Sequence, residues 1–240
     1  MKAWGISHVG MARKLNEDSF HICMSADQQN GHFIVCDGMG GAKAGDVASR
    51  LATDTFAGQF DPATEYQKLE ERVKGAIQNA NTRVWEMSHT DPSLSGMGTT
   101  MVCAVVQNGS AVVGNVGDSR AYLIDDEGIH QITKDHSLVG DMLARGELTP
   151  YEAQRHPSRN VITRAIGADR KILCDLFTLQ PKPGQYLLMC SDGLTGEVSE
   201  PEIYYEVYQS EAPEKACQTL VNIANSRGGH DNITVVLVSF

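Results

Sequence analysis

The stretch His32-Phe33-Ile34-Val35-Cys36-Asp37-Gly38-Met39-Gly40-Gly41 decides the fold of this chain. Its first five residues are mostly apolar and include two β-branched side chains, which is typical of a short buried strand. Asp37 follows directly, so the pattern predicts a strand with a carboxylate at its tip. Gly38 has no side chain, and its carbonyl oxygen can approach a bound cation. The later glycines indicate a turn, but no Gly-Lys-Ser/Thr follows them, which disfavours a nucleotide P-loop.

Carboxylates beside glycine or asparagine recur at four other places in the chain. The motifs are Asn16-Glu17-Asp18, Gly117-Asp118-Ser119-Arg120, Ser191-Asp192-Gly193 and Gly229-His230-Asp231-Asn232. Asp192 follows one apolar run and Asp231 precedes another, so we expect both at strand ends. Oxygen ligands suit Mg²⁺ or Mn²⁺, whereas Zn²⁺ usually takes His or Cys. Each motif alone is compatible with a structural turn, but three aspartates at three strand ends favour one shared cation site.

Composition limits the class of protein. The chain has 240 residues, 41% hydrophobic and 21% charged, which is ordinary for a globular protein, and no linker divides it, so we expect one domain over 1–240. No apolar run reaches membrane-spanning length and the first residues lack the apolar core of a signal peptide, so we expect a cytoplasmic protein that binds no membrane. The formal net charge of −10 disfavours nucleic acid as a partner.

The six cysteines include no Cys-x-x-Cys pair, and four of them lie in apolar runs. This pattern favours small buried thiols in a reducing compartment over a disulfide framework or a zinc site.

The order of the predicted elements indicates the fold class. Apolar periodicity predicts helices at 44–56, 69–87, 201–209 and 213–226. Strands are predicted at 3–9, 19–25, 32–36, 99–106, 110–116, 121–124, 172–178, 185–190 and 232–240, with a tight hairpin at Asn108-Gly109. Because the strands come in hairpin runs, we expect an α+β fold with antiparallel sheets and outer helices, not a doubly wound parallel sheet. Residues 137–160 are predicted to be a surface excursion with short helical pieces.

Taken together, the motifs resemble those of the metal-dependent Ser/Thr protein phosphatases of the PPM (protein phosphatase 2C) family in their bacterial form. The motifs in family order are Arg13…Glu17-Asp18, Asp37 to Gly41, Gly98-Thr99-Thr100, Gly114 to Arg120, Ser191-Asp192-Gly193 and Gly229 to Thr234. They run from residue 13 to 234 and cover nearly the whole chain. The resemblance implies a central antiparallel β-sandwich flanked by α-helices on both faces, a four-layer αββα arrangement. It also implies a single catalytic domain with a variable flap at about 137–160.

The resemblance further implies two Mn²⁺ or Mg²⁺ ions, with a third, weaker ion in bacterial members. The implied ligands are Asp37 as the bridge between two ions, Asp192 and Asp231 on the first, the Gly38 carbonyl on the second, and Asp118 with Asp192 on the third. Glu17 would act on the second ion through water, Asp18 would support the other ligands, and Arg13 would bind phosphate.

Two positions depart from the family pattern. Met39 stands where animal members have a histidine proposed as general acid, so another group must protonate the leaving oxygen. His136 is a candidate, although a surface or structural role is the commoner one for such a histidine. Asn160 stands where some bacterial relatives have a serine ligand in the flap, which weakens the case for the third ion.

The activity implied is hydrolysis of phosphoserine and phosphothreonine in proteins. A water activated between two cations would attack phosphorus in line, with no covalent intermediate. Cysteine phosphatase chemistry is disfavoured because the chain has no Cys-x₅-Arg pattern. The partners would be phosphorylated proteins, including a bacterial Ser/Thr kinase that the enzyme opposes, with a monomer as the default state.

Two other functions fit the same features: a catalytically inactive binding module on this fold, and a hydrolase of small phosphomonoesters. The presence of Asp37, Asp192 and Asp231 argues against the first. Side-by-side turnover of a phosphopeptide and p-nitrophenyl phosphate would distinguish a protein phosphatase from a hydrolase of small phosphomonoesters.

Overall fold

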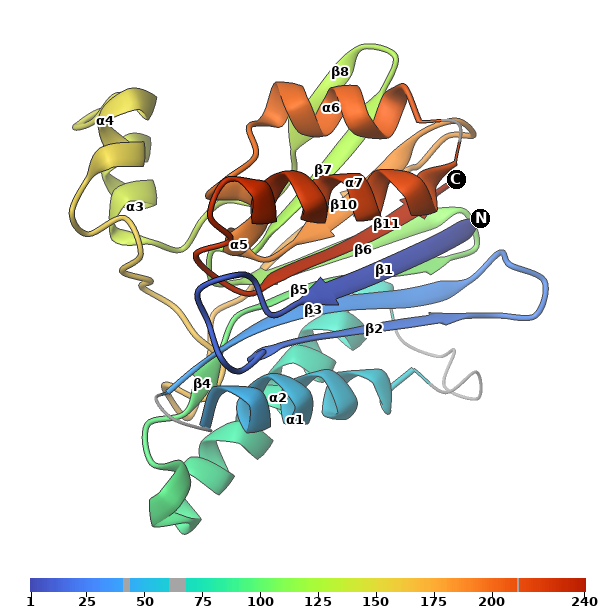
Figure 1. Ribbon diagram of the computed structural model, residues 1–240. Coiled ribbons are helices and arrows are strands. Elements are labelled where there is room, and N and C mark those ends of the chain that lie inside the picture. The colour runs from blue at the N-terminus through green and yellow to red at the C-terminus, as the bar shows by residue number, and fades with distance from the viewer. Residues whose placement is uncertain (41–43, 61–67, 211) are drawn as a thin grey trace.

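The computed structural model describes residues 1–40, 44–60, 68–210 and 212–240. In this part of the chain the strands form two antiparallel sheets packed face to face, and helices cover the outer face of each sheet (Figure 1). This is the predicted α+β sandwich with four layers in the order αββα. Gly41, the last residue of the opening motif, lies outside the described residues.

One five-stranded sheet, here sheet A, has the strand order β1-β11-β10-β7-β8. Its strands are β1 (Lys2–His8), β7 (Arg120–Asp125), β8 (Gly128–Gln131), β10 (Tyr186–Cys190) and β11 (Ile233–Ser239). Its outer face is covered by α6 (Glu200–Tyr208) and α7 (Pro213–Ser226), and the one-turn helix α5 (Asp192–Thr195) follows β10. The first and last strands pair with each other, which brings the two ends of the chain together (Figure 1).

The second sheet, sheet B, has the order β2-β3-β5-β6-β9, and β4 pairs with the end of β3. Its strands are β2 (Asp18–Met24), β3 (Gly31–Met39), β4 (Gly98–Thr99), β5 (Met101–Gln107), β6 (Ser110–Val116) and β9 (Asp175–Leu179). Its outer face is covered by α1 (Ala44–Ala57) and α2 (Leu69–Thr90), and the short helix η1 (Pro92–Leu94) follows α2.

Strand β3 is buried on both of its faces. Phe33 and Val35 pack between the two sheets, whereas Ile34 and Cys36 pack against the helices on the outer face. Successive side chains of a strand point to opposite faces, so a strand covered on both sides is apolar throughout. This explains why the stretch that begins at His32 lacks an alternating pattern.

Most elements lie where the sequence predicts them. Asn108 and Gly109 both have positive φ, 52° and 76°, as a two-residue hairpin with a primed turn requires. Ser199 begins α6 with a capping box, and Pro201 lies in the first turn, where its missing N–H costs no hydrogen bond.

Three predictions were wrong in detail. The strand predicted at 172–178 begins only at Asp175. Neither β8 nor α5 was predicted from the sequence. Finally, Asp37 is not the last residue of its strand, because pairing of Gly38 and Met39 with β4 extends β3 by two residues beyond it.

The cysteines are free, as expected: Cys36, Cys103, Cys190 and Cys217 are buried, Cys174 is half-buried and Cys23 is exposed. Among the described helices, none combines the length and the apolar character needed to cross a bilayer.

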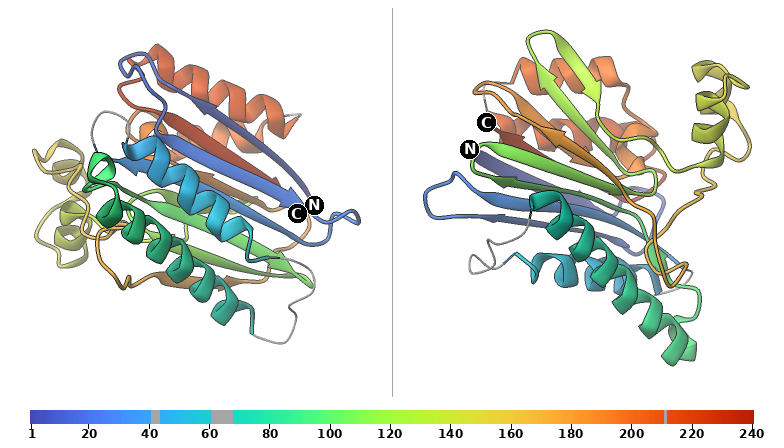
Figure 2. Two further views of the ribbon diagram at one scale, coloured as in Figure 1. Left: turned by 90° about the horizontal axis from the view of Figure 1, so that it is seen from below. Right: turned by 180° about the vertical axis from the view of Figure 1, so that it is seen from behind.

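Helices α3 (Leu138–Ala144) and α4 (Pro150–Arg155) lie in the predicted flap. They project from one end of the sandwich, as Figure 1 and the right-hand view of Figure 2 show. A backbone hydrogen bond of 2.8 Å from Leu138 to Val161 joins the two ends of this segment.

Candidate active site

Four aspartates from both sheets meet at one end of the sandwich. Asp18 begins β2 and lies opposite Asp37 of β3 in the strand register. Asp192 is the first residue of α5, directly after β10, and Asp231 stands two residues before β11. Because these strand ends lie at the same end of the sandwich (at the left in Figure 1), four distant segments bring their carboxylates together.

Asp118 joins this cluster from the turn between β6 and β7, where the chain crosses from sheet B to sheet A. Burial and the neighbouring charge of Asp192 raise the pKa of Asp118 to about 7. Burial and the charges of Asp18, Asp192, Asp118 and Asp231 raise the pKa of Asp37 well above its ordinary value. Like charges held this close disfavour simultaneous ionisation.

Two hydroxyl groups donate hydrogen bonds to the carboxylate of Asp18. Ser191 Oγ and Thr234 Oγ1 donate to Asp18 Oδ2 at 2.8 and 2.6 Å. Even so, burial raises the pKa of Asp18 to about 7. The other oxygen, Oδ1, is sealed from solvent and has no hydrogen-bond partner among the described residues.

Hydroxyl groups also fix the backbone of Asp37. Its N–H donates to Thr100 Oγ1 at 3.0 Å, and its carbonyl accepts from Thr99 Oγ1 at 2.8 Å. Thr100 Oγ1 and Ser119 Oγ lie 2.7 Å apart, which ties the Asp37 strand to the turn that carries Asp118. The Gly98-Thr99-Thr100 motif therefore positions Asp37 without presenting a charge.

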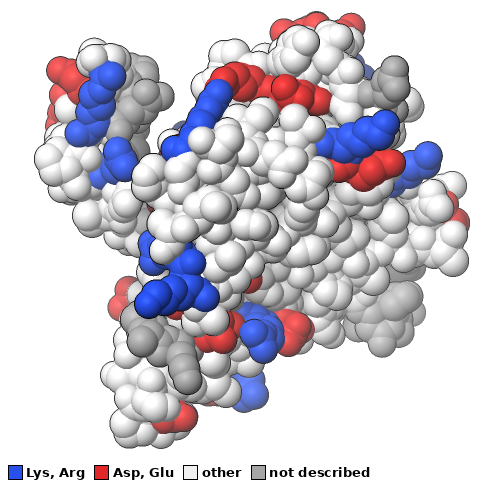
Figure 3. All heavy atoms as spheres, viewed as in Figure 1, with Lys and Arg blue, Asp and Glu red and all other residues white. Residues whose placement is uncertain are grey.

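Arg13 lies in the loop between β1 and β2, with half of its side chain exposed. Its Nη2 donates to Asp231 Oδ2 at 2.8 Å, and the charge of Asp231 is the main cause of its raised pKa. The side chain of Asn232 holds this loop, since it accepts from the Glu17 N–H and donates to the carbonyls of Val9 and Leu15. Figure 3 shows basic side chains gathered over this loop, beside acidic ones.

Glu17 points toward the start of α1. Burial is the main cause of its raised pKa, and its Oε1 is buried without a hydrogen-bond partner among the described residues. The backbone at Gly38 and Gly45 comes so close to Glu17 and to each other that a Cβ at either glycine would collide with them. Gly38 is therefore required for close packing and not for a turn, because it continues the strand.

The cluster fits a binding site for hard divalent cations. Four carboxylates here have a buried oxygen that lacks a partner in the described part of the chain: Glu17, Asp18, Asp46 and Asp192. Buried polar atoms in folded proteins nearly always have partners. The donors are all oxygens, which suits Mg²⁺ or Mn²⁺.

Another buried polar network lies beside this cluster and is satisfied within the protein. Arg120 Nε and Nη2 donate to the carboxylate of Asp135 at 2.6–3.1 Å, and Arg120 Nη1 donates to Tyr122 Oη. Arg120 therefore stabilises the turn around Asp118 through Asp135, and its charge only partly offsets those of Asp118 and Asp192.

His136 belongs to a similar structural network. Its Nδ1 accepts from the Gly117 N–H at 3.2 Å, and its Nε2 lies 3.2 Å from Asp175 Oδ2, to which it donates. Asp175 also accepts from Arg164 Nη1 at 2.9 Å. Burial lowers the pKa of His136, so it is neutral and bonded at both nitrogens. These contacts favour the structural role over that of a general acid.

Sequence reasoning missed several residues that shape the site. Asp46, in the first turn of α1, has a buried oxygen without a partner in the described chain, and its charge contributes to the raised pKa of Glu17. An acidic residue in a first helical turn is common, so no signal marked it. Asn160, the departure in the flap, is exposed. Met39 is half-buried at the end of β3.

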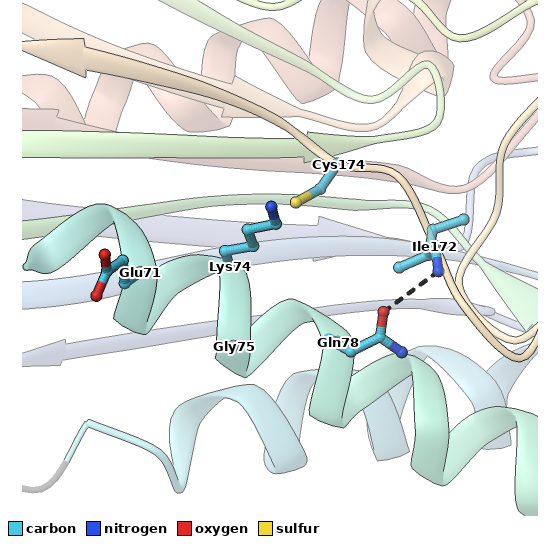
Figure 4. A pocket seen from close by; sticks show the side chains of 6 residues that line it. All are labelled: Glu71, Lys74, Gly75, Gln78, Ile172 and Cys174. Atoms are coloured by element: carbon cyan, nitrogen blue, oxygen red, sulfur yellow. Dashed lines mark hydrogen bonds between the residues drawn. The ribbon is translucent and has the colours of Figure 1, made fainter. Parts of the chain in front are cut away.

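A separate cavity of about 280 Å³ lies between α2 and the segment before β9 (Figure 4). It is lined by Glu71, Lys74, Gly75, Gln78, Ile172 and Cys174. None of the residues predicted from the sequence to act in catalysis lines it.

Comparison with known proteins agrees with the geometry. Residues 3–139 match the family described as protein phosphatase 2C. The serine/threonine phosphatase stp of Listeria monocytogenes serotype 4b is 38% identical over 232 residues, which cover 95% of this chain and 92% of that protein.

Solved structures are similar over the full chain. Serine/threonine phosphatase Stp1 from Staphylococcus aureus has a TM-score of 0.93 and 36% identity, covering 100% of this chain and 94% of that one. The catalytic domain of the phosphatase PstP in complex with two manganese ions has a TM-score of 0.86 and 30% identity, covering 99% and 97%. The chain therefore belongs to the protein phosphatase 2C (PPM) family and is a bacterial-type, metal-dependent protein serine/threonine phosphatase.

Proposed function

We propose that the aspartate cluster is the catalytic centre and that it holds two divalent cations, Mn²⁺ or Mg²⁺, with a weaker third position. Asp37, Asp192 and Asp231 would hold the first ion, and Asp37 with the Gly38 carbonyl would hold the second. Glu17 would act on the second ion through water, Asp18 would orient the neighbouring ligands, and Asp118 with Asp192 would hold the third ion.

One observation carries this proposal: five aspartates from distant segments crowd together, and burial and their mutual charge raise the pKa values of Asp37 and Asp192, while Arg13 is the cation that pairs with the cluster among the described residues. Such repulsion destabilises the protein unless a ligand of opposite charge relieves it. Cations bound there supply a water of lowered pKa and neutralise charge on the phosphoryl oxygens.

Arg13 is proposed to hold the phosphate of the substrate. Its guanidinium group has five N–H donors, and the contact with Asp231 uses one nitrogen, Nη2. The exposed half of the side chain leaves the remaining donors facing solvent, where a phosphoryl group can accept two hydrogen bonds from one planar fork. The pairing with Asp231 also keeps Arg13 oriented over the cluster before substrate arrives.

Substrates are proposed to be phosphoserine and phosphothreonine proteins, including a bacterial Ser/Thr kinase that this enzyme opposes. Residues 1–240 are proposed to form a single catalytic domain, with the α3–α4 segment as its variable flap. Relatives that align over nearly the whole chain support this organisation.

The test is hydrolysis of a phosphothreonine peptide after removal of metal by EDTA. We expect the chelated enzyme to be inactive and Mn²⁺ or Mg²⁺ to restore turnover. Activity that survives chelation would rule out the cation-dependent site. Parallel turnover of p-nitrophenyl phosphate tests substrate class, and a preference for the small ester over the peptide would contradict the assignment of protein substrates.

A further inference from the structure

A second group of metal-ligating side chains lies at the far end of the β2–β3 hairpin. Cys23 lies opposite His32 in the strand register, and His21 stands two residues before Cys23 on the same face. One ligand atom from each of the three residues lies within 4.8 Å of the others. The Cys23–His32 pair is five residues along both strands from the Asp18–Asp37 pair, about 17 Å at strand spacing.

These side chains have no hydrogen-bond partner in the described part of the chain. His32 is only 8% exposed. No hydrogen bond within residues 1–40, 44–60, 68–210 and 212–240 involves the imidazole nitrogens of His21 or His32, or the thiol of Cys23. The two rings are stacked, with centroids 5.3 Å apart and planes 9° from parallel. The ring nitrogens of the two histidines and the thiol of Cys23 are therefore free to bind a ligand.

We propose that His21, Cys23 and His32 form a binding site for Zn²⁺, distinct from the catalytic centre. Two imidazole nitrogens and one thiolate are the ligands that this borderline-soft ion takes in proteins, with water able to complete a tetrahedron. The catalytic cluster offers oxygens alone and therefore prefers harder ions. One hairpin thus carries two sites of opposite chemical preference at its two ends.

The geometry needs little change to close around the ion. Zinc bonds of about 2.0–2.3 Å place ligand atoms roughly 3.5 Å apart, so the donors must move together by about 1 Å. Cys23 is exposed and on β2, the edge strand of sheet B, where rotation of its side chain meets little resistance. Burial lowers the pKa of His32 to about 4, so its imidazole is neutral and can coordinate at neutral pH.

Ring packing is the competing explanation for the histidine pair. His32 also contacts the ring of Phe60, with centroids 5.6 Å apart. Ring packing explains the stacked histidines without any role for a thiol, whereas zinc binding requires the thiolate of Cys23. Substitution of Cys23 therefore distinguishes ring packing from zinc binding.

Cobalt(II) is the probe, because a thiolate bound to Co²⁺ gives a charge-transfer absorption that oxygen ligands do not. The protein is first stripped of all metal and then placed in saturating Mg²⁺. It is titrated with Co²⁺ and afterwards with Zn²⁺. We expect one equivalent of Co²⁺ with a thiolate band, displaced by one equivalent of Zn²⁺. The band should vanish in Cys23→Ser, and Zn²⁺ affinity should fall at least about tenfold in His21→Asn.

The matched control is Cys174→Ser, which changes the other cysteine that is not buried. It should keep the band, as should Asp192→Asn at the catalytic centre. Absence of the band in the unmodified protein, its persistence in Cys23→Ser, or its loss in Cys174→Ser would each overturn the proposal. Phosphatase activity in Mg²⁺ should be unchanged in Cys23→Ser, which separates this site from the catalytic one.

Discussion

Asp118 and Arg120 are two residues apart, yet they belong to different networks. The charge of Arg120 is paired with an opposite charge, whereas the charge of Asp118 has like charges beside it. Arg120 meets Asp135 through three nitrogen–oxygen contacts of 2.6–3.1 Å, so that pair is neutral within the protein. Asp118 instead faces Asp192, and each charge disfavours the other. The fold can therefore supply an arginine to a carboxylate at this end of the sandwich. Where it does not, the unneutralised charge is available to a ligand, at the expense of stability.

The largest expected effect comes from removing one charge from the unneutralised cluster. Asp192→Asn should reduce turnover of a phosphopeptide by at least about 10³-fold, because the variant loses a proposed cation ligand and the electrostatic stabilisation it supports. Folding should be retained, since like-charge repulsion is relieved. Steady-state kinetics in saturating Mn²⁺ and circular dichroism check the two halves of this prediction.

The matched control is Asp126→Asn, which removes the same charge from an exposed turn. It should leave turnover unchanged. Full activity of Asp192→Asn in Mn²⁺ would contradict the proposal that the aspartate cluster binds the catalytic cations.

The opposite result is expected in the neutral network. Asp135→Asn should lower the free energy of unfolding by about 3 kcal/mol, because it leaves the largely buried Arg120 guanidinium without its counter-ion. Urea denaturation measures this change. The loss should be equal with and without Mn²⁺, and a loss confined to the cation-loaded protein would show that the two networks are not separate.

A smaller effect is expected at the cation paired with the cluster. Arg13→Ala should lower kcat/KM by about 10- to 100-fold, the value of one or two charge-assisted hydrogen bonds to phosphate. Lys14→Ala, which removes a charge from the same exposed loop, is the control and should have little effect. Equal losses in both variants would mean that the loop acts only through its overall charge.

The smallest effect is a pH dependence of stability in the metal-free protein. The pKa of Asp18 is about 7 in the folded state, against an ordinary value of 3.8, so the folded chain binds a proton there that the unfolded chain releases. The free energy of unfolding should therefore fall as pH rises from about 4 to 7.

Comparison of Asp18→Asn with the unmodified protein in EDTA isolates this contribution, because asparagine does not titrate. The variant should show a flatter pH profile and greater stability at pH 8. Identical pH profiles of stability would mean that the pKa of Asp18 is not raised in the folded protein.

Features that depend on local pattern could be predicted from the sequence. The Asn108-Gly109 hairpin follows from turn chemistry, and helix α2 from its apolar stripe. The convergence of Asp37, Asp192 and Asp231 could be anticipated because each adjoins a buried strand, and strand ends gather at the edges of a sandwich.

Features that depend on distant partners could not. Strand β8 is short and half-exposed, and its pairing with β7, not its composition, makes it a strand. The extension of β3 depends on β4, which follows about sixty residues later. The hydrogen bonds from the Ser191 and Thr234 hydroxyl groups to Asp18 could not be predicted, because the three residues come from distant segments of the chain.

The position of β11 has a consequence for how the enzyme is made. This strand lies between β1 and β10, and Asp231 and Asn232 directly precede it. Until it emerges from the ribosome, β1 and β10 have no partner between them, and pairing the first strand with the last requires closure of a very long loop. The loop that carries Arg13 is also held by Asn232, so the site forms only after that late step. We therefore expect a nascent chain to lack phosphatase activity until β11 is inserted, and a chain truncated before β11 to remain inactive.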